Sequence, residues 1–138
     1  MKKHIGVIVA CGWLWMILLV GGTPAPAMDR WAALSMVESG NNDAAVGQAG
    51  EVSRYQIKPW LWEKYCPPYL AAARANPHAA LRAAQAIMHV RCREFERHFH
   101  RPPTDFEYYV LWNAPAQIRK PGRVVSERAS RFCNLVGA

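Results

Sequence analysis

One long stretch without a helix breaker, residues 79–99, constrains the fold of this chain more than any other feature. Asn76 is a good N-cap in front of it, and Pro77 suits the first turn of a helix. Pro102 and Pro103 terminate the stretch. Its apolar side chains recur at the spacing of one helix face, and the positions are Leu81, Ala84, Met88, Phe95 and Phe99. The sequence therefore predicts a long amphipathic helix and a mainly α fold.

Breakers divide the chain before this helix into three shorter segments. Apolar residues at three-residue spacing predict a helix over residues 28–38, which the polar stretch 40–43 ends. Glycines punctuate residues 44–57, so we expect a short irregular or β-hairpin lobe after the first helix. Pro59 begins a short helix that ends at Pro67.

The C-terminal part predicts two more helices. Thr104 and Glu107 have the spacing of a capping box, which opens a helix over residues 105–113. A final helix is expected over residues 124–136. The chain has 138 residues and about half of them are apolar, so it is large enough for one compact domain with its own core.

The first 27 residues have the pattern of an export signal. Lys2 and Lys3 precede an apolar run over residues 5–20, and residues 25–27 fit the small-x-small cleavage rule. We therefore expect a signal peptide over residues 1–27 and a mature domain over residues 28–138, in the periplasm or outside the cell. The run is also just long enough to span a bilayer, so an uncleaved inner-membrane anchor is the alternative. Any membrane association would run through residues 5–22.

The formal net charge is +7, and the mature part stays basic. A basic surface suits simple solubility, and it also suits attraction to an anionic polymer. An exported chain without a phosphate-binding motif is a poor candidate for nucleic acid, whereas cell-wall polymer carries peptide carboxylates. We expect no nucleic-acid partner, no cofactor and a monomer. The mature cysteines are too far apart for a zinc pattern, and His98 and His100 would point to nearly opposite faces of a helix, so we expect no metal.

Three cysteines remain after residue 27: Cys66, Cys92 and Cys133. Outside the cytoplasm a disulfide is expected, with one thiol left over. The sequence leaves the pairing open. Cys66 with Cys92 is the preferred pair, because both flank one contiguous helical hairpin.

Glu38 is the candidate for chemistry. It lies at the end of an apolar helix, and a flexible polar stretch follows it. A carboxyl in such a place can be half-buried and still open toward a cleft, and burial raises its pKa as a general acid at neutral pH requires. By itself a glutamate at a helix end is usually a solvated surface residue, so the case for a catalytic role depends on the surrounding motifs.

Three motifs accompany Glu38 in order along the chain. The first joins it to a polar and small-residue stretch, Glu38-Ser39-Gly40, Asn42, Ala45-Val46-Gly47 and Gly50. The others are Tyr55-Gln56-Ile57-Lys58-Pro59 and Tyr109-Val110-Leu111-Trp112-Asn113-Ala114-Pro115. Together they resemble the soluble lytic transglycosylase (SLT) family, a branch of the lysozyme-like superfamily related to goose-type lysozyme. The resemblance covers residues 29–136 and implies a small lysozyme-like domain.

The resemblance also implies roles for individual residues. Glu38 matches the family's catalytic acid, and Ser39 the serine that commonly supports it. Gln56 matches a glutamine that lines the cleft, and Asn113 an asparagine that reaches the sugar or the acid. Among the aromatic residues, Tyr55 and Trp112 are the preferred candidates for the cleft because each adjoins a motif polar residue, whereas Trp31 is assigned to the core. The expected substrate-binding residues are thus Ser39, Tyr55, Gln56, Trp112 and Asn113.

The chain departs from the family pattern in three places. Residues 53–56 read Ser-Arg-Tyr-Gln where the family usually has Gly-Leu-Met-Gln, and Pro115 replaces an expected glycine. Phe132 lies roughly where the family often has a tyrosine near the acid, so one hydroxyl is expected to be missing.

The expected function is cleavage of the β-1,4 bond between N-acetylmuramic acid and N-acetylglucosamine in peptidoglycan glycan strands. Asp43 and Glu51 are the only nearby acids, and both read more simply as turn or surface residues, so we expect one catalytic carboxylate and 1,6-anhydromuramyl products. Lysozyme-type hydrolysis is the second choice of reaction. A non-catalytic glycan-binding or envelope-assembly module with the same fold is the alternative function, and a small exported structural or inhibitor protein is the third.

Overall fold

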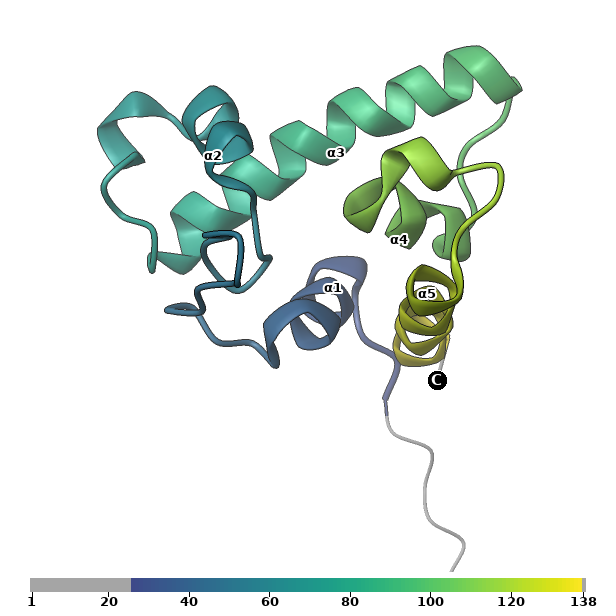
Figure 1. Cartoon of the computed structure of the whole chain (residues 1–138), viewed down its shortest axis with the longest axis horizontal. Coiled ribbons are helices and arrows are strands. Elements are labelled where there is room, and N and C mark those ends of the chain that lie inside the picture. Colours follow the sequence, from purple (N-terminus) through teal and green to yellow (C-terminus); the bar gives the residue numbers. More distant parts are fainter. Residues whose placement is uncertain (1–25, 138) are drawn as a thin grey trace, which may run out of the picture.

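The computed structural model describes residues 26–137, and this part of the chain is mainly α-helical (Figure 1). Within the described residues, five α-helices and two short 3₁₀ turns follow one another as α1 Arg30–Ser39, α2 Pro59–Tyr65, η1 Pro68–Leu70, α3 Pro77–Phe99, α4 Asp105–Asn113, η2 Pro115–Gln117 and α5 Arg123–Val136. The helices expected from the sequence are confirmed, with ends that differ by at most about two residues.

Local side-chain chemistry sets several of these ends. The Asp29 carboxylate accepts the Trp31 and Ala32 backbone N–H groups at the start of α1, and Asn76 caps α3 in the same way. The capping box of Thr104 and Glu107 is formed. Arg101 donates to the Glu107 carboxylate at 2.6 Å, and this ion pair lowers the pKa of Glu107 to about 2.

Helix α4 lies at the centre of the core. All of residues 108–112 on it are buried, and it packs against α5, α3 and η2. Figure 1 shows α3 running across the molecule, from α2 and the irregular segment at one end to α4 at the other. The largest fully buried side chains come from both ends of this arrangement, namely Trp62, Tyr109, Phe132, Leu34 and Ile57.

The segment between α1 and α2 forms the irregular lobe that the sequence predicts. Its only pairings among the described residues are two isolated antiparallel bridges, Val46 with Val52 and Val52 with Ile57, so the β-hairpin form is not present. The backbone explains why. Ser53 has a φ of 68° and Gln56 a φ of 51°, so the chain turns tightly within residues 53–56 instead of extending as a strand.

All three mature cysteines are free thiols in the structure, so the predicted disulfide between Cys66 and Cys92 is wrong. Cys66 is buried at the C-terminal cap of α2. Cys92 instead lies beside Trp31 and Tyr108, on the side of α3 that faces α1 and α4. Cys66 thus lies at the end of α2, whereas Cys92 lies on α3 with residues of α1 and α4 around it, although α2 packs against α3.

The predicted signal peptide, its alternative as an anchor and the cleavage site before Met28 fall on residues 1–27, and nearly all of that segment lies outside the described residues. Within residues 26–137, none of the helices combines the length and the apolar character that crossing a membrane requires.

Candidate active site

Glu38 lies in the last turn of α1, and its side chain meets α4. Its Oε1 accepts a hydrogen bond of 2.6 Å from the Tyr109 hydroxyl and a longer one, 3.5 Å, from Asn113 Nδ2. Tyr109 and Asn113 are four residues apart on α4, so they share one helix face. The motif that begins at Glu38 and the motif of residues 109–115 are thus brought together at this carboxyl.

Opposing influences act on the Glu38 carboxyl. Burial is the largest, and it raises the pKa of Glu38 above its ordinary value. The hydrogen bonds from Tyr109 and Asn113 and the positive charge of Arg128 favour the carboxylate and lower the pKa, while the charge of Glu51 raises it. The pKa of Glu38 remains raised, so the protonated form persists to higher pH than in an exposed glutamate.

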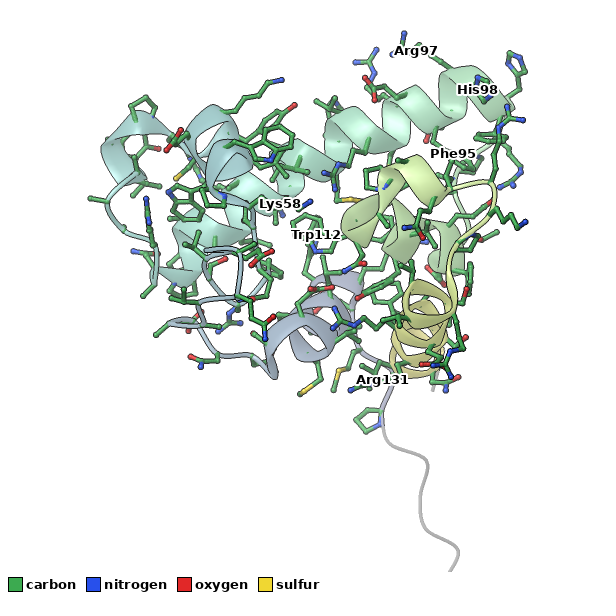
Figure 2. All side chains as sticks on the ribbon, viewed as in Figure 1. Lys58, Phe95, Arg97, His98, Trp112 and Arg131 are labelled. Atoms are coloured by element: carbon green, nitrogen blue, oxygen red, sulfur yellow. The ribbon has the colours of Figure 1, made fainter. Side chains whose placement is uncertain are left out.

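A cleft of about 690 Å³ opens beside this carboxyl. The irregular lobe and the start of α2 form one wall, and the ends of α1 and α4 with α5 form the other. Figure 2 shows the Lys58 and Trp112 side chains between these two parts of the molecule, and both line the cleft. The polar and aromatic residues of the lining are Glu38, Gln48, Glu51, Gln56, Lys58, Trp60, Arg91, Trp112, Asn113 and Arg128.

Gly47 lets two acceptor oxygens reach the cleft wall. A Cβ atom at this position would lie 2.2 Å from Glu51 Oε2 and 2.6 Å from Gln56 Oε1. The Gln56 amide nitrogen donates to the Ser53 carbonyl, which turns its oxygen toward Gly47, and Glu51 Oε2 accepts the Ala49 backbone N–H at 3.0 Å. A hydroxyl or N–H donor of a bound molecule would find two acceptors side by side here.

Arg91 fixes the end of α4 that carries Trp112 and Asn113. Its Nη1 donates to the carbonyls of Leu111 and Trp112 at 2.8 and 2.7 Å, which are the unpaired acceptors of a last helical turn. Burial lowers the pKa of Arg91. Arg91 therefore has a structural role at the floor of the cleft, and it keeps Trp112 and Asn113 in place.

Ser39 supports the lobe and not the acid itself. Its hydroxyl donates to the Arg54 carbonyl at 2.8 Å and accepts the Asn42 backbone N–H at 3.1 Å. Arg54 in turn forms a two-bond ion pair with Asp43, at 2.6 and 2.9 Å. These contacts tie the end of α1 to the lobe, and they leave Asp43 committed to Arg54 and absent from the cleft lining.

The predicted position of Tyr55 in the cleft is wrong. The side chain is 4% exposed and packs edge-on between Trp31 and Trp112, with ring centres 6.1 and 6.3 Å away. Within the tight turn of residues 53–56, the backbone directs Tyr55 into the core and Gln56 to the cleft. Trp60, 58% exposed, lines the cleft in its place, and Trp31 packs against the core as expected.

The hydroxyl expected to be missing beside the acid is present, because Tyr109 supplies it from α4. Phe132 is fully buried on α5 and packs against the Tyr109 ring, 5.7 Å between ring centres. Tyr109 was not predicted to be the partner of Glu38, although its position one helical turn before Asn113 was a usable signal. The cleft positions of Glu51, Lys58 and Arg128 were not predicted either.

Within residues 26–137, no group of three or more histidine, cysteine or acidic residues is placed to hold a metal ion. Comparisons of the chain with models of protein families, with curated proteins and with solved structures found no match.

Proposed function

We propose that this protein cleaves the β-1,4 bond between N-acetylmuramic acid and N-acetylglucosamine in peptidoglycan, with Glu38 as the acid. One observation carries the proposal: a half-buried carboxyl with a raised pKa, held by the Tyr109 hydroxyl at 2.6 Å, lines an open cleft. A glycosidic oxygen is a poor leaving group until it is protonated, and a glutamic acid whose pKa is raised by burial can supply that proton.

The cleft suits a polysaccharide. It combines the large apolar faces of Trp60 and Trp112 with the amides of Gln56 and Asn113. Aromatic faces pack against the C–H faces of sugar rings, and amides pair with hydroxyl and acetamido groups. An exported protein meets one abundant polymer of this chemistry, the glycan of the cell wall.

The proposed reaction uses Glu38 twice. In the first step Glu38 gives its proton to the glycosidic oxygen, the bond to the muramyl anomeric carbon breaks, and the muramyl acetamido oxygen attacks that carbon to form an oxazolinium-like ring. In the second step the muramyl 6-hydroxyl attacks the same carbon and gives its proton to Glu38, while the bond from that carbon to the acetamido oxygen breaks; this closes a 1,6-anhydro ring and restores both the acetamido group and the acid. Between the steps Glu38 is a carboxylate, the form that Tyr109, Asn113 and Arg128 favour.

Lysozyme-type hydrolysis is the second candidate function, and the position of Glu51 favours it. Glu51 was expected to be a surface or structural residue, but it lines the cleft together with Glu38, and its charge raises the pKa of Glu38. A second carboxylate in the cleft could orient a water molecule toward the anomeric carbon. The two reactions share Glu38 as acid and differ in the attacking oxygen.

The proposal is tested with Glu38→Gln, which keeps the shape of the side chain and removes the titrating proton. Glu63→Gln on α2 is the matched control, because Glu63 is exposed and lies outside the cleft lining. Release of soluble muropeptides from purified peptidoglycan should fall by at least about 10³-fold in Glu38→Gln, and Glu63→Gln should retain wild-type activity. Equal activity of the two variants would reject Glu38 as the acid.

A further inference from the structure

The cleft carries more positive charge than the proposed reaction uses. Of its three basic side chains, Arg91 is committed to the carbonyls at the end of α4. Lys58 and Arg128 are exposed, and neither takes part in an ion pair within residues 26–137. They come from opposite walls, since Lys58 precedes α2 and Arg128 lies on α5.

Lys58 has no evident structural task. Lys58 occupies the N-cap position of α2, but its side chain makes no capping hydrogen bond, and it lines the cleft together with Trp112 (Figure 2). Arg128 is not among the buried residues of α5, and it lines the cleft together with Glu38. Its charge acts on both Glu38 and the Tyr109 hydroxyl, which places Arg128 on the acid's side of the cleft.

We propose that Lys58 and Arg128 bind a carboxylate on the muramyl substituent, which makes this a cleft for acid-bearing glycan strands and not for neutral ones. The inference rests on the proposed function, because it takes muramyl strands as the substrate. Of the two sugars in that strand, only the muramyl residue carries a lactyl group, which ends in a carboxylate or continues into a peptide with carboxylates of its own. Within residues 26–137, neither Glu38 nor Glu51, the two acids of the cleft lining, forms an ion pair with Lys58 or Arg128.

Binding measurements test the inference separately from catalysis. In the Glu38→Gln background, which prevents turnover, Lys58→Met and Arg128→Met remove one charge each while they keep a long apolar side chain. Lys64→Met is the matched control, because Lys64 is exposed on α2, the helix that Lys58 precedes, and lies outside the cleft lining. Titration calorimetry would use three soluble probes: a peptide-bearing muramyl oligosaccharide, the same strand after removal of its peptides, and a chito-oligosaccharide without carboxylates.

Each cleft substitution should weaken the binding of a carboxylate-bearing probe about three- to fivefold, as expected for a solvent-exposed ion pair, and the loss should shrink at high salt. A loss confined to the peptide-bearing probe identifies a stem-peptide carboxylate, and a loss shared with the peptide-free strand identifies the lactyl carboxylate. Lys64→Met should bind every probe as its parent does.

Two results would overturn the inference: affinities that do not change, or an equal loss for the chito-oligosaccharide. Its failure is distinguishable from failure of the proposed function. A protein that cleaves peptidoglycan but binds it independently of Lys58 and Arg128 contradicts the carboxylate site alone. Binding that depends on both cations, without any cleavage by the wild type, supports the site and contradicts the enzyme.

Discussion

Tyr109→Phe removes the shortest hydrogen bond to the proposed acid and leaves the ring in place. The bond of 2.6 Å favours the charged form of Glu38, so its loss should raise the pKa of Glu38 further. A hydrogen bond to a charged group is worth about 1.5–3 kcal/mol and one between neutral groups about 0.5–1.5 kcal/mol. The difference, roughly 1–1.5 kcal/mol, corresponds to about one pKa unit.

The assay is the pH dependence of kcat/KM on soluble glycan strands. The acid must be protonated to react, so activity is lost as the pH rises through the pKa of Glu38 in the free enzyme. In Tyr109→Phe this alkaline limb should move up by about one pH unit. Tyr108→Phe is the matched control, because Tyr108 is also buried on α4 but packs against Trp31 and Phe132. An alkaline limb that does not move, or that moves equally in both variants, would refute the assignment of Glu38 as the titrating acid.

Three further predictions follow from the same structure. Because burial raises the pKa of folded Glu38 above its unfolded value, the wild type loses stability as the pH rises through that pKa. Thermal melts should therefore show a higher melting temperature for Glu38→Gln than for the wild type at pH 8, and the difference between the two should shrink toward pH 4. Gly47→Ala should displace the Glu51 and Gln56 side chains and lower kcat/KM on the order of tenfold or more, while a normal melting temperature would show that the fold is intact. Alkylation of the denatured, unreduced protein should label Cys66, Cys92 and Cys133 in every molecule, and a mass with two unlabelled cysteines would show a disulfide.

The helices could be predicted because their signals are local. The capping box at Thr104 and Glu107 and the Asn76-Pro77 start of α3 are read within a few residues, and both form as expected. Glu38 and Asn113 could be paired in advance only through the resemblance, because they are 75 residues apart and no local pattern reports their contact.

The two wrong predictions, for Tyr55 and for the disulfide, also concern features that no local pattern reports. Tyr55 and Gln56 are neighbours in the sequence, and the left-handed backbone of Ser53 and Gln56 decides which of them faces the cleft. That conformation is unusual for residues other than glycine and cannot be expected from residue type. The pairing of Cys66 with Cys92 failed because contiguity of two helices does not fix which face of α3 a cysteine occupies.

The mass of the products formed from purified peptidoglycan tests the central claim most directly. If Glu38 acts alone as acid and then base, and the muramyl 6-hydroxyl is the attacking group, liquid chromatography with mass spectrometry will show 1,6-anhydromuropeptides, each one water lighter than its hydrolysed counterpart. Products with reducing muramyl ends would contradict the non-hydrolytic reaction and assign the cleft, with Glu51 as the second carboxylate, to lysozyme-type hydrolysis. The absence of any released muropeptide would contradict the enzyme itself.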